Sequence, residues 1–102
     1  MNHRKLNTND FETCENDIYH SWEKSKQLER MIISSSNQNK WTDVLSNCQT
    51  RTMQLLLHFK KYPIGPETAY FYQHNLSEHL RNEKIIEQIR RKATKQILQL
   101  VK

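Results

Sequence analysis

The C-terminal stretch, residues 67–102, reads ETAYFYQHNLSEHLRNEKIIEQIRRKATKQILQLVK and contains neither glycine nor proline. A stripe with alternating spacings of three and four runs through it: Ala69, Tyr72, Leu76, His79, Glu83, Ile86, Arg90, Ala93, Ile97 and Leu100. Seven of these ten residues are Ala, Tyr, Leu or Ile, so the stripe predicts one apolar face on a single α-helix. We expect this helix to span residues 66–101, with Pro66 in its first turn.

A helix of this length would be a rod of roughly 54 Å, because each residue adds about 1.5 Å. It cannot bury its own stripe, so the preceding chain, or a partner, must cover it. Two further helices are predicted, over residues 9–34 and 40–61. The polar cluster at 34–39 separates the first two, and the Pro- and Gly-containing segment 62–66 separates the last two.

The first helix is expected to start at Asn9, with Glu12 completing a capping-box arrangement, and residues 1–8 are expected to be disordered. Its predicted inner face comprises Phe11, Cys14, Ile18, Trp22, Ser25, Leu28 and Ile32, widened by Tyr19 and Met31. The inner face of the second helix comprises Trp41, Val44, Leu45, Cys48, Thr52, Leu55, Leu56 and Phe59. Short connections make sequential helices antiparallel. The fold class is therefore all-α: a single domain over 1–102, an up-down-up three-helix bundle with a long third helix.

The composition agrees with this prediction. One glycine and two prolines in 102 residues argue against a β-sandwich, a barrel or a glycine-rich nucleotide loop. An apolar content of 35% predicts a thin, elongated core. No apolar run approaches the length of a membrane span, and no signal-peptide pattern follows Met1, so a cytoplasmic location without membrane contact is expected.

The net charge of +5 is concentrated after residue 35. Its densest run is Arg90-Arg91-Lys92 with Lys95, which is too short to predict nucleic-acid binding by itself. Nucleic acid is therefore not the expected partner. A helix-turn-helix reading of the 62–66 connection is also weak, because both flanking helices are too long.

Catalytic and metal chemistry are not expected. The histidines lie at 3, 20, 58, 74 and 79, with no pair at helical ligand spacing, and they are expected at exposed or rim positions. Cys14 and Cys48 fall on predicted apolar faces and are expected to be free, buried thiols. A metal site or a Cys–His pair would need tertiary convergence. We expect no cofactor, no metal and no enzyme activity.

Some apolar residues fall outside the inner faces. Met53 and Leu57 point away from the inner face of the second helix, and Ile85 and Ile89 lie to one side of the third helix's stripe. Either the bundle has wide stripes, or these residues form a groove for an amphipathic helix of another protein.

A combination of features resembles the FliT-type flagellar export chaperones, small all-helical proteins of motile bacteria. The features are Trp41-x-Asp43 at the head of the second helix, Arg51, a leucine run to Phe59, a proline-containing break, and Asn82-Glu83-x-Ile85-Ile86 in a long helix. The resemblance covers roughly residues 18–101.

The resemblance implies a chaperone that binds the C-terminal segment of the filament-cap protein FliD, prevents premature assembly and delivers it to the export ATPase complex. Some members also bind the flagellar transcription regulator. The implied client-binding residues, with neighbours added from the helical wheel, are Met53, Leu56, Leu57, Phe59, Ile85 and Ile89. Trp41, Arg51 and Glu83 also match family positions. We interpret Trp41 as a packing residue at the start of its helix, Arg51 as a member of a surface pair, and Glu83 as a residue of the bundle interior.

Some family members carry a further helix that masks this groove, and this chain stops at Lys102. An open groove predicts homodimers when no client is present. The alternatives are a FlgN-like chaperone for hook–filament junction proteins and a small helical DNA-binding or transcription-regulating protein.

Overall fold

The computed structural model describes the backbone of residues 3–101 and the side chains of residues 16–101. It contains α1 (His3–Asn37), α2 (Trp41–Lys61) and α3 (Ala69–Leu100), and no strand within that range. The predicted all-α, three-helix fold is confirmed. Two helix starts differ from the predicted positions: α1 is helical from His3 rather than Asn9, and α3 begins at Ala69 rather than Pro66. Residues 1 and 2 lie outside the described range.

The end of α1 is set by Asn39. This residue has a φ of 58°, in the left-handed region that asparagine tolerates better than most side chains. Its N–H donates to Ser36 O at 3.0 Å, and the N–H of Lys40 donates to Ser35 O at 2.9 Å, which is the Schellman pattern. The serines therefore remain helical, and α1 ends later than the predicted residue 34.

The connection from α2 to α3 is organised by Thr68. Its hydroxyl donates to Pro63 O at 2.7 Å and accepts from the N–H of Gly65 at 3.1 Å. These two bonds hold residues 63–68 in turns, which explains why Pro66 lies before α3 and not within it.

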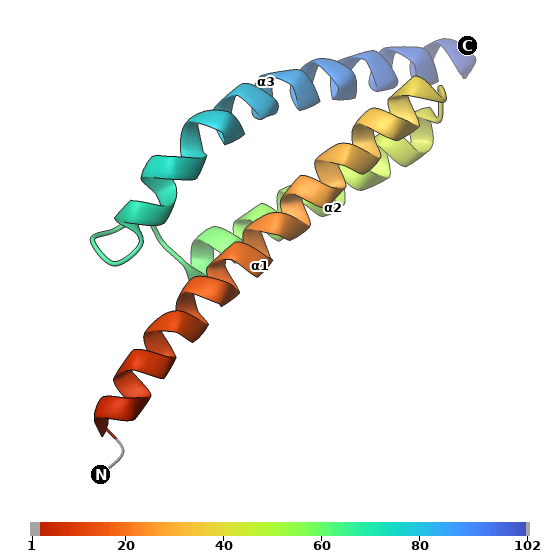
Figure 1. The fold of residues 1–102 in the computed structure, drawn as a ribbon. Coiled ribbons are helices and arrows are strands. Elements are labelled where there is room, and N and C mark those ends of the chain that lie inside the picture. The colour runs from red at the N-terminus through yellow and green to blue at the C-terminus, as the bar shows by residue number, and fades with distance from the viewer. Residues whose placement is uncertain (1–2, 102) are drawn as a thin grey trace.

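Contacts between helices fix their directions (Figure 1). Ser21 contacts His58, and Glu29 contacts Arg51, so α2 runs back along α1. Tyr72 contacts His58, and Glu83 contacts Arg51, so α3 reverses again and lies parallel to α1. The N-terminal part of α1 projects past its neighbours, and α3 bows along its length.

The core is narrow, in a molecule of 68 × 22 × 20 Å. One apolar cluster lies near the α2–α3 connection and consists of Ile18, Trp22, Leu55, Phe71 and Tyr72. The other lies towards the α1–α2 connection and consists of Ile32, Val44, Cys48, Ile86 and Ala93. A layer of charged side chains, described below, separates the two clusters. Three members of the predicted stripe on α3 are exposed, namely Glu83, Arg90 and Leu100.

Over the described residues, none of the three helices has a segment that is both long and apolar enough to cross a lipid bilayer.

Candidate partner-binding surface

Three long apolar side chains of α2 are exposed to solvent. Met53, Leu56 and Leu57 are 58%, 67% and 62% exposed, while Leu55 and His58 of the same helix are buried. The sequence spacing placed Leu56 on the inner face of this helix, and its exposure shows that this prediction is wrong. Such exposure costs solvation free energy, so contiguous apolar side chains on a surface indicate a binding site.

Leu80 of α3 belongs to the same surface. It lies one turn before Glu83, which pairs with Arg51 of α2, so Leu80 shares the α2-facing side of α3. Leu56 lies one turn before Phe59, which stacks on Tyr72 of α3, so Leu56 shares the α3-facing side of α2. Leu80 is 55% exposed. Both leucines therefore flank the α2–α3 seam at the same level of the bundle, between the Arg51–Glu83 and Phe59–Tyr72 contacts.

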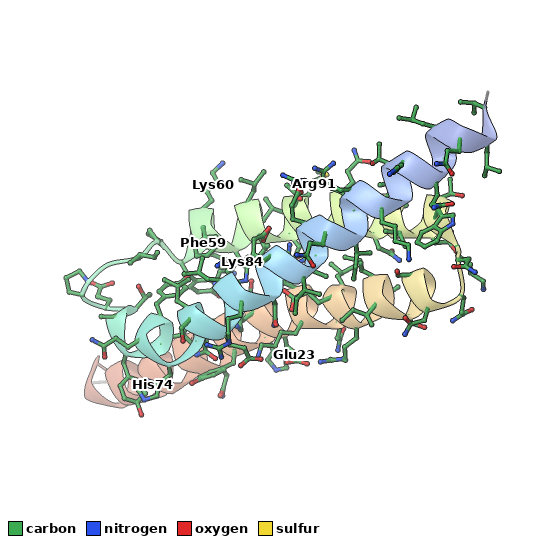
Figure 2. The ribbon with its side chains drawn as sticks, turned by 90° about the horizontal axis from the view of Figure 1, so that it is seen from above. Glu23, Phe59, Lys60, His74, Lys84 and Arg91 are labelled. Atoms are coloured by element: carbon green, nitrogen blue, oxygen red, sulfur yellow. The ribbon has the colours of Figure 1, made fainter. Side chains whose placement is uncertain are left out.

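We call Met53, Leu56, Leu57 and Leu80 the seam patch. Phe59, which was also predicted to bind the client, is half-buried and packs against the first apolar cluster (Figure 2). Its ring lies edge-on to Trp22 and stacks with Tyr72. Phe59 therefore supports the patch from beneath and offers little area of its own.

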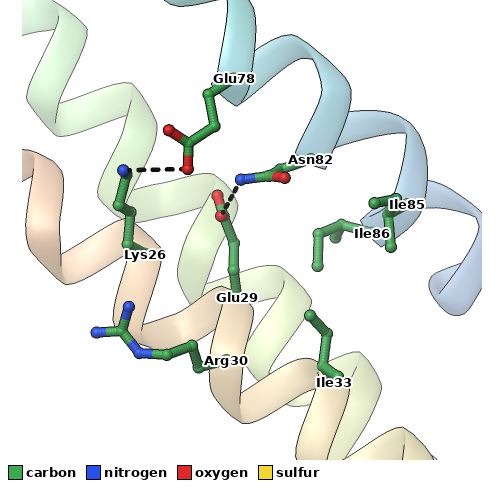
Figure 3. Close-up of a pocket in the computed structure, with 8 residues that line it drawn as sticks. All are labelled: Lys26, Glu29, Arg30, Ile33, Glu78, Asn82, Ile85 and Ile86. Atoms are coloured by element: carbon green, nitrogen blue, oxygen red, sulfur yellow. Dashed lines mark hydrogen bonds and ion pairs between the residues drawn. The ribbon is translucent and has the colours of Figure 1, made fainter. Parts of the chain in front are cut away.

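Ile85 and Ile89 do not join the seam patch. Ile85 lines a different surface hollow, of about 200 Å³, between α1 and α3 (Figure 3). Ile33 of α1 faces it there, while Ile89 is half-buried against the second apolar cluster. The six predicted residues thus lie on two faces of the bundle. Leu80 is the residue that sequence reasoning missed, although its exposure follows from its place beside the stripe.

The α1–α3 hollow is more polar than the seam patch. Its edge carries an ion pair between Lys26 Nζ and Glu78 Oε1 at 3.3 Å, and Asn82 donates to Glu29 at 3.2 Å in its floor (Figure 3). The hollow has five polar lining residues, and each already has a partner within the bundle, because Arg30 pairs with Glu23. The hollow therefore has fewer unmet contacts to offer than the seam patch does.

A buried charged cluster joins all three helices at mid-length. Arg51 of α2 is almost fully buried; its Nη2 lies 3.0 Å from Glu29 Oε2 of α1, and its Nη1 lies 3.0 Å from Glu83 Oε1 of α3. Glu29 also accepts from Asn82 of α3. Arg51 was predicted to pair at the surface, but it is buried with its partner Glu29. Glu83 was predicted to lie in the bundle interior, but it is half-exposed at the rim.

His58 forms a second buried polar network. Only 1% of this residue is exposed, which contradicts the expectation that the histidines lie at the surface. Nδ1 is 2.8 Å from Ser21 Oγ, and Nε2 is 2.9 Å from the hydroxyl of Tyr72. That hydroxyl donates its proton to Tyr62 O at 2.6 Å, so Nε2 of His58 must donate to Tyr72 and Nδ1 must accept from Ser21.

Burial shifts the pKa values in this network. Desolvation, with a smaller contribution from the charge of His79, lowers the pKa of His58 to about 4. Desolvation raises the pKa of Tyr72 to about 12. Both groups are therefore neutral at physiological pH. The Ser21–His58 contact resembles part of a nucleophilic dyad, but the imidazole is enclosed in the aromatic core, so the network is structural.

Cys48 is buried and free, as predicted, and burial raises the pKa of its thiol. The Cys14 side chain lies outside the described range. Among the side chains of residues 16–101, no group of three or more His, Cys, Asp or Glu could hold a metal ion.

The thiol of Cys48 is expected to be inert in the folded protein. In a Cys14→Ser background, its reaction with a disulfide reagent such as DTNB should be at least about 100-fold slower than in denaturant, because attack needs an exposed thiolate. The measurement is the absorbance time course with and without urea. A rate in buffer equal to the denatured rate would show that this part of the core opens freely.

The chain was compared with family models, curated proteins and solved structures, and none of the three comparisons finds a match.

Proposed function

We propose that this chain is a cytoplasmic export chaperone of the FliT type, which binds the C-terminal helical segment of the flagellar filament-cap protein FliD. Binding would prevent premature assembly of the client and allow its delivery to the export apparatus. The observation that carries this proposal is the seam patch: four apolar side chains from two adjacent helices, each more than half exposed. The sequence resemblance supplies the identity of the client.

The shape of the seam patch suits a helical ligand. Two antiparallel helices form a shallow seam between them, and an amphipathic helix can lie along such a seam with its apolar side chains at positions i, i+3, i+4 and i+7. The patch covers on the order of a few hundred Å², a size typical of functional apolar patches on monomers. Contacts around it would extend the interface to that of an ordinary complex.

Basic residues lie at one end of the patch. Lys60 and Lys61 lie three and four residues after Leu57 on α2, and both are exposed; Figure 2 shows Lys60 on the outer side of the helix. Neither forms an ion pair with a described residue. Charges at the rim of an interface mainly accelerate association and select partners. A client segment with carboxylates beside its apolar stripe would therefore bind fastest.

The role needs no catalytic group. The buried side chains of Arg51 and His58 find their partners on the neighbouring helices, so they hold the helices in register and leave the binding energy to apolar contact. Client release would come from competition at the export machinery.

Substituting the seam patch should abolish client binding. In the Leu56→Asp/Leu80→Asp variant, the Kd for the C-terminal segment of the filament-cap protein from the same organism should rise at least about 100-fold, because two carboxylates would be desolvated at the centre of the contact. Isothermal titration measures this change. The variant should retain its helical circular dichroism, since both side chains stand in solvent.

Ile85→Asp is the matched control, because Ile85 is 48% exposed but lies in the α1–α3 hollow. Its Kd should stay within about threefold of the wild-type value. If Ile85→Asp abolished binding while the seam variant bound normally, the client site would be the hollow instead. If the wild-type chain bound a hook–filament junction protein and not the cap segment, the chain would belong to the sister class of chaperones.

A further inference from the structure

The outer face of α3 carries a basic stripe that contains one neutral residue, Gln88. Arg81, Lys84, Gln88, Arg91 and Lys95 follow one another at spacings of three, four, three and four, the same repeat as the apolar stripe but on the opposite side. All five are exposed. Figure 2, which looks down onto α3, shows Lys84 and Arg91 along it. The run at 90–95 is therefore only part of this face, because the helix adds Arg81 and Lys84 to it.

The carboxylates in this segment do not neutralise the stripe. Glu83 and Glu87 are the only acidic residues between positions 81 and 95. Glu83 pairs with the buried Arg51, and Glu87 is bonded closely to Arg90 at 2.6 Å and only loosely to Arg91 at 3.8 Å.

Three cations of the stripe form no ion pair with any residue whose side chain the structure describes, and these are Arg81, Lys84 and Lys95. Lys92 lies beside the stripe, over the ring of Trp41 at 5.4 Å, and adds a further positive charge. The stripe therefore keeps an excess of positive charge after all the internal pairs are counted.

The stripe lacks the features that other anionic partners need. No Phe, Tyr or Trp occurs on α3 after Tyr72, and the ring of Trp41 beside the stripe is already covered by Lys92, so bases of a single strand would find no free aromatic ring to stack on. No apolar side chain belongs to the stripe between Arg81 and Lys95, and the same spacing reaches a single exposed one, Leu98, beyond its end. Both acidic amphipathic helices and lipid surfaces gain most of their binding free energy from several apolar contacts. A duplex phosphate backbone requires only an array of cations.

We propose that this stripe binds the phosphate backbone of double-stranded nucleic acid, without base specificity and on a surface separate from the seam patch. The stripe is about 21 Å long, since fourteen intervals rise by about 1.5 Å each. Duplex DNA presents one charge per about 1.7 Å over that length, so four or five cations can each meet a phosphate. The proposal does not depend on the chaperone role, because the two surfaces share no residue.

The test is fluorescence anisotropy with a labelled 20-base-pair DNA duplex at several salt concentrations. The Arg81→Gln/Lys84→Gln/Lys95→Gln variant should bind at least about tenfold more weakly, with a slope of log K against log salt shallower by about 2 to 3. The matched control is Lys24→Gln/Lys60→Gln/Lys61→Gln, which removes three exposed lysines elsewhere. Both variants have a formal net charge of +5 − 3 = +2. The control should bind within about threefold of the wild type.

Equal weakening in both variants would overturn the proposal, because binding would then follow net charge and not this face. Undetectable wild-type binding at low salt would overturn it too. Polyglutamate that competes as well as unlabelled duplex would reassign the stripe to acidic proteins, and stripe-dependent binding to anionic vesicles without duplex binding would reassign it to membranes. The stripe variant should bind the filament-cap segment as the wild type does, which is measured separately. If the variant lost that binding, the chaperone proposal would need revision, but the nucleic-acid proposal would not.

Discussion

Replacing Glu29 with alanine is expected to lower the free energy of unfolding by about 3 kcal/mol, a large part of the total for a domain of this size. The substitution would leave the guanidinium of Arg51 buried and without its main partner. Removing one member of a buried ion pair typically costs about 3 to 5 kcal/mol. We expect the lower end here, because the half-exposed Glu83 would still pair with Arg51. Urea denaturation followed by circular dichroism measures the loss.

Two further variants isolate the cause. Glu23→Ala removes a carboxylate from the same helix, where Glu23 pairs with Arg30 at the surface, and should cost no more than about 1 kcal/mol. Glu29→Met/Arg51→Met removes both buried charges and should be more stable than Glu29→Ala alone, because no unpaired charge remains. A Glu29→Ala loss equal to that of Glu23→Ala would mean that water reaches Arg51 and that the cluster is not a buried one.

The buried charged cluster is a part of the fold that could not be predicted from the sequence. Periodicity predicted buried apolar residues such as Ile18, Trp22 and Val44, because an apolar face on one helix implies burial against another. Glu29 and Arg51 are equally buried, yet a charged residue on a single helix reads as solvent-exposed. Their burial depends on three helices meeting at one level, which no pattern within one helix reveals. The same reasoning missed His58.

The candidate binding surface shows a related limit. The apolar surplus on the second and third helices was visible in the sequence, but the rotation of α3 about its axis was not. That rotation turns Ile85 towards Ile33 of α1 and brings Leu80 beside the α2 seam. Because the apolar stripe of α3 is wide, the sequence allowed either side of the stripe to face α2. Specific contacts, such as Arg51 with Glu83 and Phe59 with Tyr72, decide which side faces α2.

Acidification is expected to destabilise the fold through His58. The pKa of this imidazole is about 4 in the folded chain and about 6.5 when it is exposed by unfolding. Between these values the unfolded state binds more protons, so the free energy of unfolding falls as the pH drops from about 6.5 to 4. The full shift corresponds to about 3 kcal/mol, at about 1.4 kcal/mol per pH unit. Burial also lowers the pKa of His79, which adds to the loss in the same direction.

The His58→Gln variant separates this effect from the protonation of carboxylates, which occurs at similarly low pH. A glutamine amide can still donate to Tyr72 but cannot titrate, so the variant should be less stable than the wild type at pH 7.5 and should lose less stability on acidification. Urea midpoints measured at pH 7.5, 5.5 and 4 for both proteins give the difference. Protonation would place a positive charge on an imidazole that is buried among Trp22, Phe59 and Phe71, so the wild type loses the stability that the neutral imidazole contributes. The two proteins should therefore converge in stability near pH 4. If the stabilities of the two proteins instead changed in parallel with pH, His58 would take up its proton in the folded core as readily as in water. The neutral hydrogen-bond network from Ser21 to Tyr62 would then not hold α2 to its neighbours.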